Sequence, residues 1–333
     1  MKVLSRVGRP DIAEVYLLDF GNGRILEAVE ALQPPLPRER KWVLLVSTMF
    51  GCPINCPMCD AGGPSRGPAS AREIWAQIDE LVLPRYPDSV VPCRQFKIQF
   101  ARMGEPALNP AVLDVIEALP GRFQAPGLMP AVSTVAPAGR DAFFERLRDI
   151  KLSLYSGGRF QFQFSIHTTD ESLRRKLVPC RTWDFGRMAE FGERFFVPGD
   201  RKIALNFALV RGAAIDPDVL RRHFDPAKFL IKVTPLNPTH KALAHGLRSL
   251  VDPLDPAQVD LTPLRAAGYD VLLSIGEPEE NRIGSNCGQY VRTHLAGKRR
   301  LENGYSYWDA GSDSPAGSSS SLREASNTPP PSE

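Results

Sequence analysis

Apolar and polar positions follow two periods along most of the chain. Short apolar segments predict β-strands, and apolar positions at three- and four-residue spacing between them predict amphipathic helices. The predicted strands are 43–48, 96–100, 131–135, 161–166, 203–210, 229–234 and 270–274. The predicted helices are 71–83, 111–119, 141–150, 172–177, 185–195, 218–223 and 263–267. Strands that alternate with helices indicate an α/β fold built on a parallel sheet.

The number of strand–helix units distinguishes two parallel-sheet architectures. Six or seven units fall within the alternating region, which favours a full or partial barrel over an open doubly wound sheet. Composition alone does not separate these two architectures. We predict a partial (β/α)6-type, TIM-like barrel.

The two ends of the chain differ from the alternating region. Residues 13–20 and 25–32 flank GNGR, a sequence typical of hairpin turns, and the Pro-rich sequence QPPLPRER follows. We therefore predict an N-terminal β-hairpin extension and linker over 1–40 and a core barrel over 41–300. Residues 301–333 are rich in Ser and Pro and poor in apolar residues, which predicts a disordered tail.

Composition and charge narrow the class of protein. The chain has 333 residues, of which 43% are hydrophobic and 24% charged, with a formal net charge of +3. These values exclude a collagen, a coiled coil or a wholly disordered chain. The net charge alone does not indicate nucleic-acid binding. No apolar run reaches the ~18 residues of a membrane-spanning helix, and the N-terminus lacks the pattern of a signal peptide. We expect a cytoplasmic protein without a membrane partner.

Three of the six cysteines lie close together in the chain. Cys52, Cys56 and Cys59 form the sequence GCPINCPMC directly after a predicted strand. A cytosolic chain of this length does not need a disulfide framework, so the spacing indicates metal ligation or redox chemistry. Three thiolates can bind three irons of a [4Fe–4S] cluster and leave the fourth iron open. A zinc site is the alternative, but structural zinc usually has four ligands.

Six segments in this order resemble the radical SAM superfamily and, within it, the dual-specificity 23S rRNA adenine methyltransferases. The segments are GCPINCPMC, RMGEPALN, VSTVAP, FSIHTTDESLRRKLVP, VTPLNPT and SNCGQ. The resemblance implies that Cys52, Cys56 and Cys59 hold a [4Fe–4S] cluster and that S-adenosylmethionine (SAM) binds the open iron. An enzyme of this kind generates a 5′-deoxyadenosyl radical and needs an electron donor such as flavodoxin or ferredoxin.

The same resemblance implies a set of residues that bind SAM. They are Gly104, Glu105, Ser133, Ser165, Ile166, His167 and Asn237. All lie at or after the ends of predicted strands, where ligand sites of α/β barrels occur. Simpler roles stay open for several of them. Serines at strand ends can cap backbone groups, a histidine can be a satisfied core residue, and Asn237 can be a turn residue.

Two further residues match catalytic positions of the family. The cysteine equivalent to Cys287 receives a methyl group from one SAM molecule and becomes S-methylcysteine. A radical formed from a second SAM then abstracts hydrogen from that methyl group, and the carbon radical adds to an adenine ring. Glu27 aligns with the proposed proton acceptor of the family. The alternative is that Glu27 is a solvated glutamate on a strand with no catalytic role.

The chain departs from the family pattern at two places. Leu45 stands where the family has a cysteine that resolves the covalent adduct by forming a disulfide with the methyl-bearing cysteine. Cys93 and Cys180 do not lie at the matching position. The segment before Cys52 is also shorter than the accessory domain that helps the rRNA enzymes to bind RNA. This difference predicts a divergent member for which RNA is a doubtful substrate and a small molecule or a peptide is possible.

The sequence leaves three functions open. The leading one is a radical SAM enzyme that transfers a methyl group to an unreactive carbon through S-methylcysteine. The first alternative keeps the radical but performs hydrogen abstraction, rearrangement or protein activation on a non-RNA substrate. The second alternative is a non-catalytic metal-binding protein.

Overall fold

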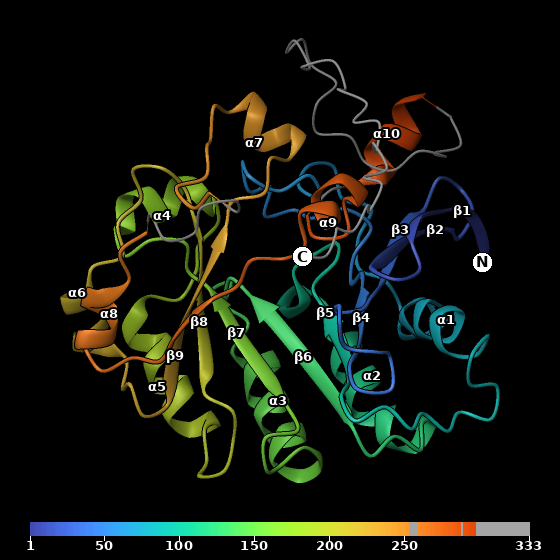
Figure 1. Ribbon diagram of the computed structural model, residues 1–333, viewed down its shortest axis with the longest axis horizontal. Helices are drawn as coiled ribbons and strands as arrows, with labels where there is room; N and C mark the ends of the chain where they lie inside the picture. Colours follow the sequence, from blue (N-terminus) through green and yellow to red (C-terminus); the bar gives the residue numbers. More distant parts are fainter. Residues whose placement is uncertain (253–258, 288, 298–333) are drawn as a thin grey trace, which may run out of the picture.

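The computed structural model describes residues 1–252, 259–287 and 289–297, and the strands within them form one sheet in chain order (Figure 1). β1 to β4 pair antiparallel, whereas β4 to β10 pair parallel. The strands are β1 (Lys2–Arg9), β2 (Ala13–Asp19), β3 (Ile25–Ala31), β4 (Trp42–Val46), β5 (Phe96–Phe100), β6 (Leu128–Thr134), β7 (Gln161–Ser165), β8 (Ile203–Leu209), β9 (Phe229–Pro235) and β10 (Val271–Leu273). The tail predicted over 301–333 lies outside the described residues.

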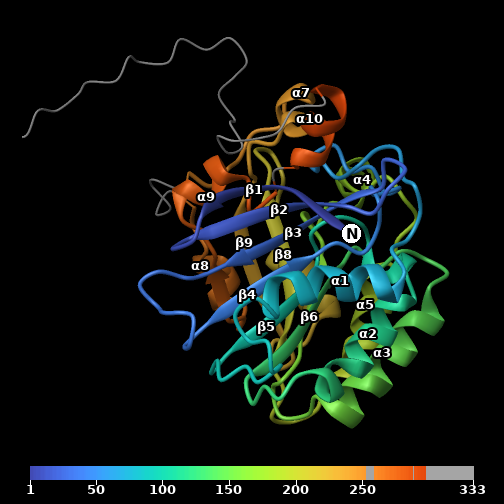
Figure 2. The same cartoon turned by 90° about the vertical axis from the view of Figure 1, so that its right-hand side faces the viewer.

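Helices connect the parallel strands and cover the outside of the sheet, where α1, α2 and α3 lie side by side (Figure 2). The helices are α1 (Ala71–Val82), the 3-10 helix η1 (Pro106–Leu108), α2 (Ala111–Arg122), α3 (Asp141–Leu154), α4 (Glu171–Leu177), α5 (Phe185–Phe195), α6 (Pro217–His223), α7 (His240–Ala244), α8 (Thr262–Ala266), α9 (Pro278–Ile283) and α10 (Tyr290–Gly297). None of the helices in the described residues is long and apolar enough to span a bilayer.

The predicted fold class is confirmed. β4 to β9 supply six parallel strands with helical connections, and β10 adds a seventh parallel strand. β1 and β10 stand at the two ends of the strand order, so the described strands form a partial barrel. Every predicted strand and helix overlaps an observed one, because alternating burial on strands and amphipathic spacing on helices are local signals.

Besides the short 3-10 helix η1, four observed elements have no counterpart in the predictions. β1 is an edge strand with a charged, mixed pattern, and α7 is only a short turn of helix. α9 (PEENRI) and α10 carry too few apolar positions to show a helical period. All four lie at the edge of the sheet or at the mouth of the barrel, where tertiary contacts rather than local pattern decide the structure.

The two faces of the parallel strands carry different chemistry. On β5, Phe96, Ile98 and Phe100 are fully buried against the helices, whereas Lys97 and Gln99 alternate with them and face the barrel interior. β9 follows the same rule, with Lys232 on its inner face. The apolar core therefore lies between the sheet and its helices, and the inner faces of β5 and β9 contribute polar side chains to the barrel interior.

The N-terminal hairpin is buried on both faces. Leu18 and Leu26 belong to the main core with α1, whereas Leu17 and Val29 pack in a second cluster with Ile283 and residues of α10. β3 is therefore buried at every position. The hairpin joins the barrel to the C-terminal helices α9 and α10, because its two faces pack against different parts of the chain.

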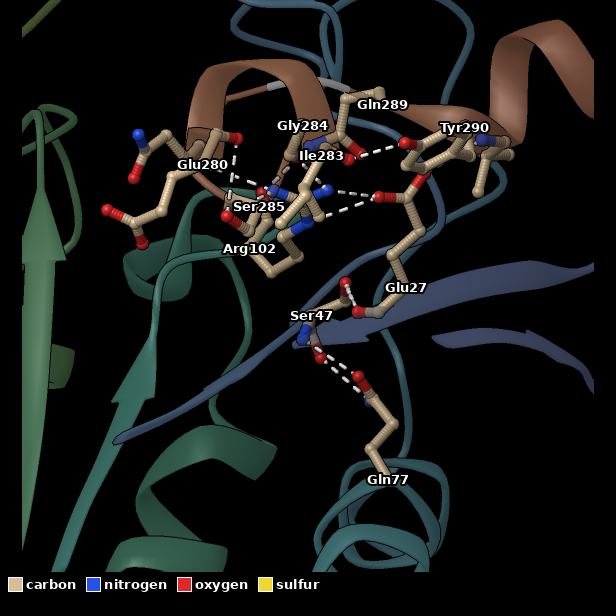
Figure 3. A network of polar contacts seen from close by, with 12 residues as sticks. Glu27, Ser47, Gln77, Arg102, Glu280, Ile283, Gly284, Ser285, Gln289 and Tyr290 are labelled. Atoms are coloured by element: carbon tan, nitrogen blue, oxygen red, sulfur yellow. Dashed lines mark hydrogen bonds and ion pairs between the residues drawn. The ribbon is translucent and has the colours of Figure 1, made fainter. Parts of the chain in front are cut away.

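A buried glutamine on α1 fixes the end of β4 (Figure 3). The Gln77 side chain accepts a hydrogen bond from the Ser47 amide at 2.8 Å and donates one to the Ser47 carbonyl at 3.0 Å. The Ser47 hydroxyl donates to the carbonyl of Glu27 on β3. Both backbone polar groups of Ser47 are therefore paired although Ser47 lies beyond the end of β4. The segment that follows Ser47 starts from a fixed position.

Gln77→Leu is expected to lower the free energy of unfolding by about 2 kcal/mol, because it leaves the buried amide and carbonyl of Ser47 without partners. Urea unfolding measures the change. Gln124→Leu is the matched control, since Gln124 is exposed, and it should change stability by less than about 0.5 kcal/mol. Equal stability of both variants would contradict the assigned role of Gln77.

Candidate active site

The cysteine-bearing loop leaves the C-terminal end of β4 and returns to α1 as a closed loop. Its two ends are joined by the Ala69 amide, which donates to the Thr48 carbonyl at 2.9 Å. The Asn109 side chain donates to both the Thr48 and the Ala69 carbonyls at 2.7 Å. Asn109 is the last residue of the RMGEPALN segment, so this segment holds the loop as well as following β5.

The middle of the cysteine loop is attached to the segment after β9. Asp60 is buried and accepts hydrogen bonds from the amides of His240 and Lys241 at the start of α7. Thr239 donates to the Met58 carbonyl at 2.9 Å, and the Lys241 ammonium donates to the Asn55 side chain at 2.6 Å. Sequence reasoning missed these residues, although Thr239 belongs to the VTPLNPT segment.

The three cysteines of the loop are half-buried and lie near one another. Burial is the main cause that raises the pKa of Cys52 to about 12 and that of Cys59 to about 11, and it raises the pKa of Cys56 as well. The thiols also raise one another's pKa, as expected for neighbouring groups that would become negative together. Such thiols become thiolates only when a metal supplies positive charge.

The donor set is compatible with a cubic cluster, because the three thiols are neighbours on one loop. Within the described part of the chain, no three His, Cys, Asp or Glu side chains converge on one point closely enough to hold one metal ion. In a [4Fe–4S] cluster each thiolate binds a different iron, so the thiols must be neighbours without sharing a centre. Cys52, Cys56 and Cys59 meet that requirement on one loop.

Glu105 is a buried carboxylate at the mouth of the barrel. It accepts hydrogen bonds from the Thr134 hydroxyl and from the amides of Ala107 and Val135, both at 3.0 Å. Burial raises the pKa of Glu105 to about 7, and no cation is among the causes that lower it. Two oxygens that accept three hydrogen bonds retain room for a further donor. A ligand ammonium such as that of SAM would supply the missing positive charge.

Gly104 serves a packing role that the sequence did not predict. Its φ is +99°, and a Cβ atom there would lie 2.6 Å from Met49 Cβ and 2.7 Å from Thr48 Oγ1. No other residue fits without moving the start of the cysteine loop. The backbone at Gly104 is therefore close to this loop, and its predicted contact with SAM stays a prediction.

The other predicted SAM contacts lie at the C-terminal ends of neighbouring strands. Ser133 and Ser165 are half-buried on the inner faces of β6 and β7. Ile166 is fully buried. His167 has a φ of +69°, and its Nδ1 atom accepts a hydrogen bond from the Ala208 amide at 3.3 Å. Burial lowers the pKa of His167 to about 4, so the ring is neutral at physiological pH.

Buried polar atoms without partners lie near this strand edge. Asn206 pairs in register with Ser165, and its Oδ1 atom is buried with no hydrogen-bond partner among the described residues. Gln289 Oε1 is also buried without a hydrogen-bond partner among the described residues. Since buried acceptors are normally paired, these atoms fit an interior that binds a polar ligand. The structure thus adds Asn206, which motif reasoning did not single out.

Cys287 lies near both the cysteine loop and Asn237. The Asn237 side chain hydrogen-bonds the thiol and favours its ionisation, whereas desolvation has the larger effect and raises the pKa of Cys287. The side chain nevertheless reaches solvent. Cys287 raises the pKa of Cys59, so the two thiols are close enough to interact electrostatically. The fold brings together residues that are more than two hundred positions apart.

Glu27 is paired with Arg102 in a buried network (Figure 3). The Glu27 carboxylate accepts from Arg102 Nη2 at 2.7 Å and from the Val291 amide at 2.7 Å, and both side chains of the ion pair are fully buried. Arg102 also donates to the carbonyls of Gly284 and Ser285 at 2.9 Å. This arrangement differs from a solvated strand glutamate. Glu27 therefore helps to anchor the segment that carries Cys287. The role of Glu27 as a proton acceptor stays a prediction.

The other cysteines and Leu45 differ in their distance from this site. Leu45 packs in the same cluster as Cys52 and Cys59, so the side chain at the position of the resolving cysteine faces the site. Cys180 raises the pKa of Cys56 and packs in one cluster with it, whereas buried Cys93 contacts the Tyr86 hydroxyl at 3.8 Å. Of the two, Cys180 is the thiol near the site.

Several proteins of similar sequence are named as RNA methyltransferases, although no family model matches the chain. A probable dual-specificity RNA methyltransferase from a Synechococcus species is 27% identical over 212 residues, which cover 62% of this chain and 57% of that protein. A relative of the same name from Thermus thermophilus is 26% identical over 287 residues, which cover 82% of this chain and 73% of that protein.

The predicted resemblance is confirmed. The chain is a divergent relative of these methyltransferases, and the matched part spans 57% and 60% of the lengths of the Synechococcus and Parasynechococcus proteins. The prediction that RNA is a doubtful substrate is not borne out, because these relatives are named as RNA methyltransferases.

A solved structure shares the fold. A radical SAM methyltransferase from Sphaerobacter thermophilus superposes with a TM-score of 0.65 at 19% identity and covers 86% of this chain and 80% of that chain. This similarity supports the fold alone. An α/β barrel can host many activities, so a shared fold does not show a shared activity.

Glu105→Gln is expected to weaken SAM binding about tenfold or more, because it removes a charge-assisted hydrogen bond to the SAM ammonium. In the unaltered protein, SAM affinity should rise from about pH 5.5 to about pH 7, since Glu105, with a pKa of about 7, must lose its proton to pair with a cation. Equilibrium dialysis with labelled SAM measures both effects. Glu117→Gln, at an exposed ion pair, is the control. The same pH dependence in Glu105→Gln would contradict this role.

Arg102→Met is expected to destabilise the protein by about 3–5 kcal/mol, because it leaves the Glu27 carboxylate buried without its cation. Amide hydrogen exchange should accelerate first at 284–291, the segment that Arg102 and Glu27 hold. Arg146→Met removes two exposed ion pairs and should cost less than about 1 kcal/mol. Unchanged exchange at 284–291 in Arg102→Met would rule out the anchoring role.

Proposed function

We propose that the chain is a radical SAM methyltransferase that uses a [4Fe–4S] cluster held by Cys52, Cys56 and Cys59. One observation carries the proposal: the cysteine loop, Glu105 and Cys287 meet at the same end of the barrel. Glu105 raises the pKa of Cys52 and Cys56, and Cys287 raises that of Cys59, so these groups are neighbours. Active sites of α/β barrels lie at this end.

Each group has a role that its surroundings support. When bound, the reduced cluster and SAM supply a carbon radical for bond formation at an unreactive carbon. Glu105 binds the SAM ammonium, and the neutral His167 and the polar ends of β6 to β8 line the remaining contact surface. Asn237 donates a hydrogen bond to Cys287 and favours the thiolate that accepts a methyl group.

RNA is the substrate class that the relatives support. Relatives named as dual-specificity RNA methyltransferases match up to 88% of this chain, including a protein at 23% identity over 301 residues. We extend that class to this chain as part of the proposal, together with a flavodoxin- or ferredoxin-like electron donor. The matched part of the chain spans 57% and 60% of two of these relatives, so RNA as the substrate of the whole protein is part of the proposal.

A second candidate function rests on Leu45. A leucine cannot form the disulfide by which the family resolves its enzyme–product adduct, and Leu45 faces the site. Radical chemistry without a covalent adduct, such as hydrogen abstraction, does not need that disulfide. This candidate predicts 5′-deoxyadenosine without S-adenosylhomocysteine.

Anaerobic turnover of the reconstituted, reduced protein with SAM separates the two candidates. Methyl transfer predicts both S-adenosylhomocysteine and 5′-deoxyadenosine, and one added methyl group on the Cys287 peptide by mass spectrometry. Cys287→Ala should lose the methyl group and S-adenosylhomocysteine but keep deoxyadenosine formation. Cys59→Ala should lose cluster absorbance and deoxyadenosine.

The control for these variants is Cys93→Ala, because Cys93 is buried away from the site beside Tyr86. It should retain the cluster and both products. Deoxyadenosine alone, with an unmodified Cys287 peptide, would favour the second candidate. Neither product and no bound iron would overturn both.

A further inference from the structure

A cavity lies at the opposite end of the barrel from the cysteine loop. It has a volume of about 430 Å³. Its walls come from the segments that precede β4, β5, β7 and β8 and from the start of β6. Because the parallel strands β4 to β9 are 5 to 7 residues long, this mouth lies about 20 Å from the candidate active site.

The walls of this cavity are strongly basic. Five cationic side chains line it: Arg40, Lys41, Arg94, Arg159 and Arg201. None of them forms an ion pair with a carboxylate in the described part of the chain. Outside the cavity, some exposed arginines pair with acidic residues, such as Arg146 and Arg187, whereas others, such as Arg221, form no ion pair in the described residues. The positive charge of the cavity is therefore uncompensated.

Two lysines extend this charge into the barrel. Lys97 pairs in register with Met129, which lines the cavity, so Lys97 lies at its inner end. Burial lowers the pKa of Lys97 to about 7, and Lys232, Lys41 and Arg201 lower it further by repulsion. Neither Lys97 nor Lys232 has a carboxylate within ion-pair distance among the described residues. Maintaining such repulsion costs stability, which an anion in the cavity would relieve.

The loop before β7 adds backbone donors to the wall. Gly157 and Gly158 line the cavity, and both have positive φ, at +71° and +78°. In the described residues, neither amide donates a hydrogen bond to another backbone or side-chain group. Unpaired amides beside guanidinium groups are typical of sites that bind oxyanions.

We propose that this cavity binds a small ligand with two or more phosphate groups, such as pyrophosphate or a nucleoside polyphosphate. Guanidinium groups bind phosphate oxygens through paired hydrogen bonds, and several cations favour more than one phosphate. The volume is within the range of small-molecule pockets. SAM carries a sulfonium and an ammonium, so this cavity does not suit the ligand proposed for the other end. The proposal does not depend on the methyl-transfer function.

Isothermal titration of the full chain with inorganic pyrophosphate tests the proposal. The test variant is the double substitution Arg40→Ala/Arg94→Ala, because both side chains are exposed and form no hydrogen bond in the described residues. The control is Arg221→Ala/Arg265→Ala, which removes the same charge from exposed positions on α6 and α8. We expect one site per chain, binding weakened about tenfold or more in the test variant and less than about twofold in the control.

Three further measurements distinguish a phosphate site from a folding defect and from an RNA-binding surface. SAM affinity and the urea midpoint of Arg40→Ala/Arg94→Ala should match the unaltered protein, which shows that the fold and the other end are intact. No binding of pyrophosphate, or equal weakening in both double variants, would overturn the proposal. Binding of a single-stranded oligoribonucleotide through these arginines, without binding of pyrophosphate, would also overturn the proposal. That result would assign the surface to RNA.

Discussion

The buried ion pair between Arg102 and Glu27 is the interaction on which the candidate site depends most. Arg102 follows β5, Glu27 lies on β3, and together they hold the backbone of Gly284, Ser285 and Val291. Three distant parts of the chain therefore meet at one guanidinium group. The segment that carries Cys287 has few apolar side chains of its own, so its position near the cysteine loop depends on these charged contacts and on the packing of Ile283, Tyr290 and Val291 against the hairpin. A buried charge that serves as an anchor is strongly coupled to the fold, because removing either partner leaves the other unpaired.

The two ends of the barrel have opposite electrostatic character. The end at the C-termini of the strands contains thiols and a carboxylate whose pKa values burial raises, and these groups are suited to iron and to a cationic ligand. The other end contains arginines and lysines that lack carboxylate partners in the described residues. Alternate residues of each strand face the barrel interior. The polar residues among them differ between the start and the end of the strands, and this difference gives the two ends their different charge. One scaffold can therefore present a cation site and an anion site without mixing their chemistry.

One departure of this chain from the family pattern lies at the position where the resemblance predicts a cysteine that resolves a covalent adduct. Leu45 occupies an inner position of β4 beside the cysteine loop, whereas Cys180 approaches the same loop from the side of α4. The motifs that hold the loop are retained, since Asn109 and Thr239 lie in segments that resemble the family and both bond to the loop backbone. Segments that resemble the family thus hold the cysteine loop, and Leu45 packs beside that loop.

The amino-acid sequence by itself determined the alternation of strands and helices, the partial barrel and the spacing of Cys52, Cys56 and Cys59, because periodicity and motif spacing are local properties of the chain. The positions of α9 and α10, the Glu27–Arg102 ion pair and the contacts of Asp60 with the start of α7 were decided by tertiary structure alone. Their partners lie 75 to 264 residues away, and no local pattern marks a buried glutamate as paired. The basic cavity was also decided by the tertiary structure. Nothing in the sequence distinguishes Arg40, Arg94 and Arg201 from other charged residues. They line one cavity because parallel strands begin at the same end of a barrel.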